Sequence, residues 1–536
     1  MPYLYRNLML SPQDSEEQLP QLLASRLAVP LAALSRICIL RKGIDARKKP
    51  QIKMVYTLSF SADDSLRSRL DGDSTVEWLE EQPIFTPPRL SSQAHVVIVG
   101  SGPAGLFAAL RLAEYGVTAT LVERGEPVEQ RALSVQRFWR DGTLNPESNV
   151  QFGEGGAGTF SDGKLTCRSK DPLMSWVLDR LISFGAQPEI GYLAKPHIGT
   201  DRLKGVIATL RNHLIDKGFT VRFGTRFTDL TITDGKVTAI TVNDTEEIPC
   251  DHLILATGHS ARDTFQLLER RGVPLQAKPF AMGLRVEHPQ ELVNLIQYGR
   301  QTATCLPAAD YALTWNNTTT GRSAYSFCMC PGGVVVGGAS EAGGVVTNGM
   351  SGQHRNSPYA NSALVVTIRE TDFDGAGPLG GMRLQRLWEQ RAFDAGGGGF
   401  QAPAQNLMTF LRMPGKGEVR SSYRPGICET DLSTVLPPYV IQTLREGIVD
   451  FGRKMRGFIT AEATLIGIES RTSSPVRIVR GSGFESVGVS GLYPAGEGAG
   501  YAGGIMSSAV DGIKIADALA KRLEACINSP AAPSFG

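Results

Sequence analysis

The sequence contains only eight cysteines among 536 residues, and they are scattered along the chain. No Cys-x-x-Cys or Cys-x4-Cys occurs, and no spacing of cysteine and histidine suits a zinc ion. This absence also disfavours a disulfide reductase, whose reaction uses closely paired cysteines. We therefore expect no metal site, and we expect a cytoplasmic protein whose thiols stay reduced.

Long apolar runs and an excess of either charge are also missing. No stretch approaches the roughly 18 apolar residues that a membrane-spanning helix needs, so we expect no membrane span. The start, Met1 to Leu10, has one arginine and no long apolar region, which is unlike a secretory signal. The net charge is only +2, which disfavours a general binder of nucleic acid or membrane surface, and DNA is not an expected partner.

Glycine, by contrast, is abundant, and its most informative cluster lies in residues 96–123. These residues predict a strand, a tight glycine turn, a helix, a second strand and a terminal acid, an order that binds the ADP half of a dinucleotide. Gly100 allows the sharp turn, Gly102 lets a pyrophosphate approach the backbone, and Gly105 lets the helix pack closely on the sheet. Glu123 then suits the ribose hydroxyls. The residues expected at this end of the nucleotide are Gly100, Gly102, Pro103, Ala104, Gly105, Glu123, Arg124 and Arg131.

A second glycine turn with a terminal acid, Tyr493 to Glu497, lies near the other end of the chain. An NAD-dependent dehydrogenase usually keeps its nucleotide site in one contiguous domain, whereas the extended FAD molecule reaches both ends of a split domain. The turn would hold the ribityl chain, and the positive N-terminus of the final helix would face the flavin. We therefore expect FAD as the cofactor. The residues expected on this side are Thr257, Gly258, Gly496, Glu497, Gly503, Gly504, Ile505 and Met506.

A third glycine-rich segment, Gln151 to Lys164, is the expected remaining wall of the site. Its glycines leave few side chains to pack in a core, and they let backbone N–H groups approach a ring or a phosphate. A mobile surface loop is the alternative. Lys164 would neutralise a phosphate or the flavin N1 region, or it is a surface lysine. The residues expected to bind the cofactor here are Gly156, Gly158, Thr159, Ser161 and Asp162.

The chain is too long for one core, so we expect several domains. The predicted fold class is α/β: a Rossmann-like FAD-binding domain with an inserted mixed α+β substrate domain and a small N-terminal α+β module of ferredoxin-like size. Pro83, Pro87 and Pro88 predict a linker after the module, and the segments 220–223 and 237–242 predict a small meander of strands. The predicted ranges are 1–88 for the module, 89–273 for the first FAD-binding part, 274–456 for the substrate domain and 457–536 for the C-terminal FAD-binding part.

These motifs resemble those of the glutathione-reductase-like FAD/NAD(P)-binding superfamily. The chain is similar in particular to a bacterial and plastid group of uncharacterised FAD-utilizing dehydrogenases, of which the loop Gly-Glu-Gly-Gly-Ala-Gly-Thr-Phe-Ser-Asp-Gly-Lys is the more specific mark. The resemblance implies FAD and a redox role but no particular substrate. The matching stretches are Val96–Arg124, Asn149–Lys164, Leu253–Asp263, Gly283–Pro289, Ser326–Ser340, Glu469–Arg480 and Gly491–Gly512.

No second dinucleotide fingerprint follows, because the glycine-rich stretch Gly332–Gly344 predicts no helix with a following strand and acid. We therefore expect electrons from NAD(P)H visiting the flavin face, or from a protein carrier, and a small-molecule substrate. Because flavin carries the redox step itself, no catalytic triad is needed. Cys328 and Cys330 are expected on one face of a strand, as buried thiols rather than a disulfide. The candidate catalytic residues are Lys164, Arg285, His288, Cys328 and Arg477.

The function expected from the sequence is an FAD-dependent oxidoreductase, a dehydrogenase or reductase that transfers hydride through non-covalently bound FAD. Two alternatives remain open. The first is a flavin monooxygenase, in which the reduced flavin captures oxygen. The second is an FAD-containing docking or redox-sensing protein, in which the N-terminal module binds a protein electron carrier or RNA.

Overall fold

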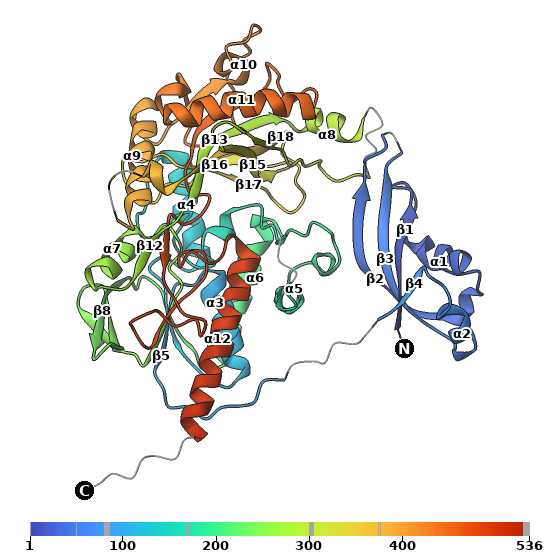
Figure 1. The fold of residues 1–536 in the computed structure, drawn as a ribbon, viewed down its shortest axis with the longest axis horizontal. Coiled ribbons are helices and arrows are strands. Elements are labelled where there is room, and N and C mark those ends of the chain that lie inside the picture. The colour runs from blue at the N-terminus through green and yellow to red at the C-terminus, as the bar shows by residue number, and fades with distance from the viewer. Residues whose placement is uncertain are drawn as a thin grey trace.

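The computed structural model describes residues 2–49, 51–79, 86–167, 171–299, 305–373, 375 and 377–528. It contains three main sheets, of which the N-terminal one stands apart from the other two (Figure 1). Of the predicted proline linker, Pro83 lies outside the described residues, whereas Pro87 and Pro88 lie in an irregular segment. Within the described parts no helix has the length and apolar character needed to cross a membrane.

The N-terminal sheet has the strand order β2-β3-β1-β4, and every neighbouring pair is antiparallel. With one helix after β1 and another after β3, this is the arrangement of a ferredoxin-like β-α-β-β-α-β motif. Apolar residues of α1 and the strands form its core. The elements are β1 (Pro2–Leu10), α1 (Leu19–Leu27), β2 (Leu34–Asp45), β3 (Lys53–Ala62), α2 (Arg67–Leu70) and β4 (Val76–Trp78).

The edge strand β2 also pairs with the rest of the chain. The N–H of Lys42 donates to the carbonyl of Tyr192, and the N–H of Ala194 donates to the carbonyl of Lys42, each at 2.8 Å. A little further on, Leu165 N–H donates to the carbonyl of Pro196 at 2.9 Å. The segment that receives the N-terminal module therefore continues into a backbone pairing with the third glycine-rich segment.

The second sheet is fully parallel and has the order β23-β11-β5-β6-β7. The strand β5 is Val-Val-Ile-Val and buried throughout, as expected of a parallel strand covered on both faces. Helices α3 and α12 pack against each other on one face of this sheet. Its elements are β5 (Val96–Val99), α3 (Pro103–Glu114), β6 (Thr120–Val122), β7 (Thr220–Arg222), β11 (His252–Leu255), β23 (Leu492–Pro494) and α12 (Ile505–Asn528).

The strand β7 corrects one expectation, because it pairs with β6 in this parallel sheet rather than with the meander. The meander is a separate antiparallel sheet of order β10-β9-β8 on the other side of the parallel sheet's core. Local sequence does not distinguish the two partners of so short a strand. The remaining elements of this part are α4 (Val128–Asp141), α5 (Leu173–Ser183), α6 (Thr200–Asp216), β8 (Phe227–Thr233), β9 (Lys236–Val242), β10 (Glu246–Pro249) and α7 (Arg262–Arg270).

The third sheet is mixed, with the order β14-β15-β18-β13-β21-β19-β20, and α11 covers it at the top of Figure 1. A separate hairpin, β16 with β17, lies beside it. The elements are β13 (Phe280–Pro289), α8 (Gln290–Tyr298), β14 (Thr314–Asn316), β15 (Ser323–Cys330), β16 (Val334–Gly337), β17 (Thr347–Met350), β18 (Tyr359–Ile368), α9 (Gly380–Ala395), β19 (Ala402–Asn406), α10 (Leu407–Phe410), β20 (Ile427–Glu429), α11 (Pro438–Lys454) and β21 (Thr464–Glu469).

The strand β21 lies between β13 and β19, near the middle of this sheet. The predicted boundary at residue 456 therefore does not coincide with the end of the sheet, since β21 follows it. The sequence pattern misses this because the strand returns to the sheet only after the long helix α11. The chain crosses back to the parallel part through β22 (Val476–Ile478), which pairs with β12 (Leu275–Ala277).

Candidate functional site

A cavity of about 420 Å³ lies beside the parallel sheet and is lined by both predicted glycine turns. Gly100 and Gly102 come from the turn between β5 and α3, and Glu497 follows β23. The two turns touch, because a Cβ placed on Gly496 would lie 2.8 Å from the Cβ of Ala104. Two segments from opposite ends of the sequence thus share one elongated site at the carboxyl ends of parallel strands, where open α/β sheets bind ligands.

The turn after β5 owes its shape to glycine at two positions. Gly100 has φ of +101°, a left-handed conformation, and a Cβ there would clash with the carbonyl of Ala256. A Cβ on Gly105 would clash with the carbonyl of Gly100. This close packing brings the N-terminus of α3 to the cavity, where its first N–H groups lack partners within the helix. The site therefore offers an anion the positive end of a helix.

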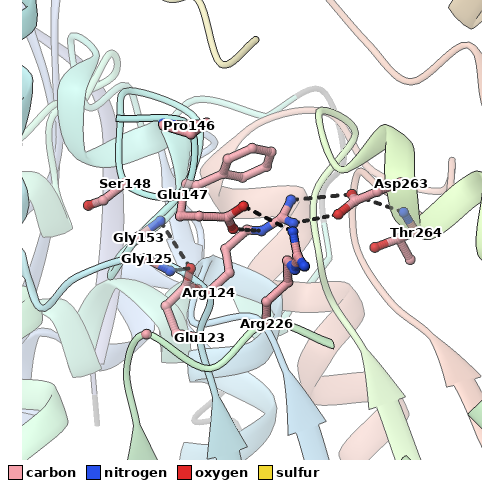
Figure 2. Close-up of polar contacts among 12 residues, drawn as sticks. Glu123, Arg124, Gly125, Pro146, Glu147, Ser148, Gly153, Arg226, Asp263 and Thr264 are labelled. Carbon is pink, nitrogen blue, oxygen red and sulfur yellow. Dashed lines mark hydrogen bonds and ion pairs between the residues drawn. The ribbon is translucent and has the colours of Figure 1, made fainter. Parts of the chain in front are cut away.

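Glu123 ties three backbone turns together, and Figure 2 shows its hydrogen bonds to two of them, at Gly125 and Gly153. One carboxylate oxygen accepts hydrogen bonds from the N–H and the hydroxyl of Ser101, each at 2.9 Å. The other oxygen accepts from the N–H groups of Gly125 and Gly153, each at 3.0 Å. The carboxylate also lines the cavity, so it joins the first glycine turn to the third glycine-rich segment at the cavity wall.

Charged side chains surround the Glu123 end of the cavity. Arg124 stacks on the Phe152 ring, with 4.4 Å from guanidinium carbon to ring centroid, and donates to Glu147 at 3.0 Å (Figure 2). Asp263 accepts from the other nitrogens of Arg124. Arg226 forms an ion pair with Glu147 at 3.3 Å and lines the cavity. These contacts hold Arg124 and Arg226 at the cavity wall.

Arg131 is placed differently from its prediction, because it is fully buried and does not line the cavity. Its guanidinium donates to backbone carbonyls of the third glycine-rich segment and stacks on Phe160, and burial lowers its pKa to about 10. Arg131 is thus a positioning residue that fixes the loop from behind. The accepting carbonyls belong to Asn149, Val150, Gly153, Glu154 and Gly156.

Asp162 and Lys164 form the wall next to the third sheet. Asp162 is almost fully buried and accepts hydrogen bonds from Arg355 and Ser351. The Lys164 amine lies 3.9 Å from Asp162 and donates to the carbonyl of Met329. Burial opposes the charge of Lys164, but Cys330, Cys328 and Asp162 outweigh it and raise the pKa of the amine. The lysine is therefore a cation held at the cavity.

The C-terminal wall contains a buried donor or acceptor with no partner. His259 Nδ1 lies 3.4 Å from Glu497, which also accepts a hydrogen bond from Gly504 N–H at 3.1 Å. Burial opposes the charge of Glu497, but His259 and Gly504 outweigh it and lower the pKa of the carboxyl. The other ring nitrogen, His259 Nε2, is buried and unpaired among the described residues, although it belongs to a cavity-lining residue. Such an atom fits a site that is completed by a polar ligand.

Most residues expected to bind the cofactor line the cavity. Thr159 is buried behind it with its hydroxyl turned to the Glu154 carbonyl, and Gly105 and Gly496 act through backbone packing. Met506 is buried in the core. The expected residues that line the cavity are Gly100, Gly102, Pro103, Ala104, Glu123, Arg124, Gly156, Gly158, Ser161, Asp162, Thr257, Gly258, Glu497, Gly503, Gly504 and Ile505.

Two of the five candidate catalytic residues, Lys164 and Cys328, line the cavity, whereas the other three do not. Arg285 is fully buried in an ion pair with Glu469 at 2.9 Å. His288 is buried against the carbonyl of Phe458, and burial lowers its pKa to about 4. Arg477 stacks on Tyr501 at 5.2 Å. Their catalytic roles stay predictions, because these three side chains lie outside the cavity lining, although Arg285 contacts the lining residues Glu469 and Cys328.

Several lining residues are absent from the predicted cofactor-binding and catalytic residues. Arg471 lines the cavity and is held by Glu389 at 3.0 Å and by Ser340. Glu389 also pairs with the buried Arg262 at 2.9 Å. Only the neighbours of the glycine-rich segment carried a signal in the sequence, since the others come from strands and loops without a local motif. The lining residues for which the sequence predicts no role include Arg226, Asn348, Glu469 and Thr472.

Comparison with known protein families identifies three regions of the chain. The family described as "FAD-dependent protein, C-terminal domain-like" matches residues 279–472, and the family described as "FAD binding domain" matches residues 93–137. A domain of unknown function matches residues 2–61. The match to residues 93–137 contains the turn between β5 and α3, and the match to residues 279–472 contains every strand of the third sheet.

Among individual proteins, an "Uncharacterized protein" of Clostridium beijerinckii is 47% identical over 525 residues, which cover 97% of this chain and 98% of that protein. A 2,4-dichlorophenol 6-monooxygenase of Delftia acidovorans is 29% identical over 204 residues, 35% of this chain and 32% of that protein. Among solved structures, CtdE in complex with FAD covers 81% of this chain and 88% of its own, with 12% identity and a TM-score of 0.31. The E. coli quinol fumarate reductase FrdA covers 81% and 71%, with 13% identity and a TM-score of 0.37.

The cofactor is FAD, as the two family descriptions state. The residues present fit it on independent grounds. The cavity is continuous between a helix N-terminus at Gly102 and a second one at Ile505, it is walled by glycines that leave room for a ligand, and it contains the unpaired nitrogen of His259. Within the described parts of the chain, no group of three or more His, Cys, Asp or Glu is arranged to hold a metal ion.

Proposed function

We propose that this chain, which belongs to the same family as the Clostridium beijerinckii protein and matches two FAD families, is an FAD-dependent oxidoreductase that acts on a small organic molecule. The single observation that carries the proposal is the cavity shared by the two glycine turns and by residues of the third sheet. A cavity that is lined on one side by the cofactor-binding turns and on another by a separate sheet can hold a second molecule next to the cofactor.

When bound, FAD supplies the transfer of a hydride or an electron pair, and the protein supplies orientation and electrostatics. The N-terminus of α3, at Gly102 to Ala104, would hold the pyrophosphate. Glu123 would bind the ribose in exchange for part of its backbone contacts, and Arg124 would flank the adenosine end. The same charged residues that now wall this end of the cavity would therefore fix the nucleotide.

At the other end, Glu497 and the free nitrogen of His259 would bind the hydroxyl groups of the ribityl chain. The N-terminus of α12, at Gly503 to Ile505, would face the flavin ring. A helix N-terminus favours negative charge, so it would stabilise the reduced form of the ring over the oxidised form. The Gly156 to Ser161 backbone would cover the ring from the third glycine-rich segment.

The substrate would bind on the wall contributed by the third sheet. Phe327, Cys328 and Asn348 line the cavity there, together with Arg471 and Thr472. We propose NAD(P)H or a protein carrier as the electron donor. We also propose that the protein is cytoplasmic and that it belongs to the glutathione-reductase-like superfamily. No second nucleotide fingerprint supports a dedicated NAD(P)H domain, so the donor would visit the same cavity.

The cofactor assignment has a direct test. The purified protein should be yellow, and Gly102→Val should be colourless yet folded, because a Cβ on Gly102 meets nothing closer than 3.7 Å in the protein and would occupy the space of the phosphate. We expect Gly102→Val to lower the affinity for FAD by about tenfold or more, which is a loss of about 1.4 kcal/mol or more of binding free energy. Gly483→Val is the matched control, because Gly483 does not line the cavity and has open space around it.

Fluorescence titration with FAD measures the affinity, and circular dichroism measures folding. A wild-type protein that is isolated without FAD and ignores added FAD overturns the proposal. So does a Gly102→Val protein that binds FAD as tightly as the Gly483→Val protein.

A flavin monooxygenase is the second candidate, and the similarity to the Delftia acidovorans monooxygenase over 204 residues favours it. The two functions differ in the fate of molecular oxygen. Turnover under ¹⁸O₂ places the label in the product of a monooxygenase, whereas a dehydrogenase or reductase leaves its product unlabelled.

A further inference from the structure

The strand β15 is irregular where it reaches the cavity. Phe327 lies opposite Ala363 on β18, but Cys330 lies opposite Asn361, so β15 contains one residue more than its partner. Cys328 lies in this bulge with φ of +46°, a conformation that non-glycine residues rarely adopt. The expectation that the two cysteines share one face of a regular strand is therefore wrong. Bulges of this kind redirect a side chain and recur next to active sites.

The bulge brings the two cysteines into contact. The Cys330 thiol donates to the carbonyl of Cys328 at 3.3 Å, so the Cys330 side chain is folded back along the chain. Cys330 is fully buried, whereas Cys328 is half-buried and lines the cavity. Cys328 thus lies at the cavity wall, and the buried Cys330 thiol lies against its backbone carbonyl.

The charges around this pair leave room for one anion. Two cations and two carboxylates face the thiols, and a third cation, Arg355, pairs with one of these carboxylates, so the five groups have a net charge of +1 before the thiols are counted. A thiolate at Cys328 would bring the total to zero. The charged groups are Lys164, Arg285, Arg355, Asp162 and Glu469.

The other titratable neighbours stay neutral. Burial lowers the pKa of His197, and burial raises the pKa of Tyr311. The neighbouring Cys330 side chain lowers the pKa of the Cys328 thiol, and Lys164 acts in the same direction. The Cys328 side chain, together with burial, raises the pKa of Cys330. One cysteine is therefore set up as a thiolate and the other as its proton-bearing partner.

We infer that Cys328 and Cys330 form a redox-active dithiol pair that exchanges two electrons with FAD. The inference rests on the proposed function. In the oxidising direction the Cys328 thiolate and the Cys330 thiol form one S–S bond, and the S–H bond of Cys330 breaks. The two electrons and the Cys330 proton pass to oxidised FAD, which becomes the singly protonated reduced anion. The negative charge moves from sulfur to cofactor, and the reverse reaction restores both thiols.

The test is an electron count on the full-length FAD protein. Anaerobic titration of the air-oxidised protein with dithionite should consume four electrons per FAD, two for the cofactor and two for the pair. The Cys328→Ser and Cys330→Ser proteins should each consume two. Cys428→Ser is the matched control and should still consume four, because Cys428 is a half-buried thiol outside the cavity lining.

A second measurement needs no variant. Trypsin releases residues 323–355 as one peptide that contains Cys328 and Cys330 and no other cysteine. The air-oxidised protein is alkylated under denaturing conditions without reductant. Its peptide should then carry no alkyl group, and its mass should be that of the dithiol peptide less two hydrogens. After dithionite it should carry two alkyl groups.

The outcomes separate the inference from the function on which it rests. A wild-type protein whose FAD is reduced by two electrons, with no further uptake and with a fully alkylated peptide, overturns the dithiol pair and leaves the flavoprotein function intact. A protein that holds no FAD overturns the proposed function instead.

Discussion

The carboxylate of Glu389 on α9 holds the guanidinium of Arg471 at 3.0 Å. Helix α9, which packs against the third sheet, therefore fixes a side chain that lines the cofactor cavity. Glu389 is 2% exposed and also binds Arg262, so it lies between two buried cations. Breaking a buried ion pair by removing one partner costs about 3–5 kcal/mol. We therefore expect Glu389→Gln to destabilise the protein by about 3 kcal/mol at neutral pH, measured by urea unfolding against the exposed control Glu462→Gln.

The same carboxylate gives a pH dependence. Burial raises the pKa of Glu389, but Arg262 and Arg471 outweigh it and lower the pKa from 4.5 to about 2. A group with a depressed pKa in the folded state stabilises the protein fully above its unfolded pKa, and this stabilisation is lost as the pH falls toward the folded pKa. The stability difference between wild type and Glu389→Gln should therefore narrow between pH 4.5 and about 2. A constant difference across that range would contradict the ion-pair role.

Arg131 offers a test of loop positioning. Replacing it by methionine leaves the carbonyls of the Asn149 to Gly156 segment without their buried donor. Hydrogen bonds to a charged group contribute about 1.5–3 kcal/mol each, so Arg131→Met should lower the melting temperature and weaken FAD binding together. Arg137→Met on the same helix α4 is the control, since Arg137 is exposed. Unchanged FAD affinity in Arg131→Met would mean that the loop holds its shape without the arginine.

Two glycine-to-alanine changes should act in opposite directions. A Cβ on Gly105 would clash with the carbonyl of Gly100, so Gly105→Ala should separate α3 from β5, lower stability by more than about 1 kcal/mol and abolish FAD binding. Gly205 lies within α6 with open space around it. Gly205→Ala should stabilise the protein by about 0.5–1 kcal/mol and leave FAD binding unchanged. Thermal unfolding and FAD titration of both variants decide this.

The thiol cluster predicts a pH profile for chemical modification. Because Cys330 and Lys164 lower the pKa of Cys328, iodoacetamide should alkylate Cys328 in the apo-protein at a pH well below the usual thiol pKa of about 8.5. Lys164→Met should move the midpoint to higher pH. Cys250 is the internal control, because burial raises its pKa to about 12. A Cys328 profile that follows an ordinary thiol would exclude a thiolate at this site.

The sequence predicts the parts of the site whose geometry is local. The turn at Gly100 to Gly105 is partly local, because a Cβ on Gly105 would clash with the nearby Gly100 carbonyl, whereas the glycine at Gly100 is required by the distant Ala256. The matching turn at Tyr493 to Glu497 was predictable for the same reason. That the two turns share a cavity required only that β5 and β23 belong to one parallel sheet, which their apolar character indicates.

What the sequence does not predict depends on long-range pairing. Arg131 has the residue type of a phosphate ligand, and only the path of residues 149–156 around it shows that its donors are already used. Arg471 and Asn348 reach the cavity because β21 and β17 belong to the third sheet or lie beside it. The bulge at Cys328 is visible only from the register of β15 on β18, since the local sequence reads as a regular strand.

The attachment of the N-terminal module through Lys42 has a consequence for shortened forms of the protein. Tyr192 and Ala194 now saturate backbone groups on the rim of that small sheet. An unpaired edge strand is a template on which another polypeptide can add a strand. A fragment that begins at residue 89 would expose the segment around Tyr192 and Ala194 without its partner strand. The isolated N-terminal module would expose the edge strand β2. Each fragment alone would thus gain a tendency to stick to copies of itself, and mixing the two fragments would suppress it.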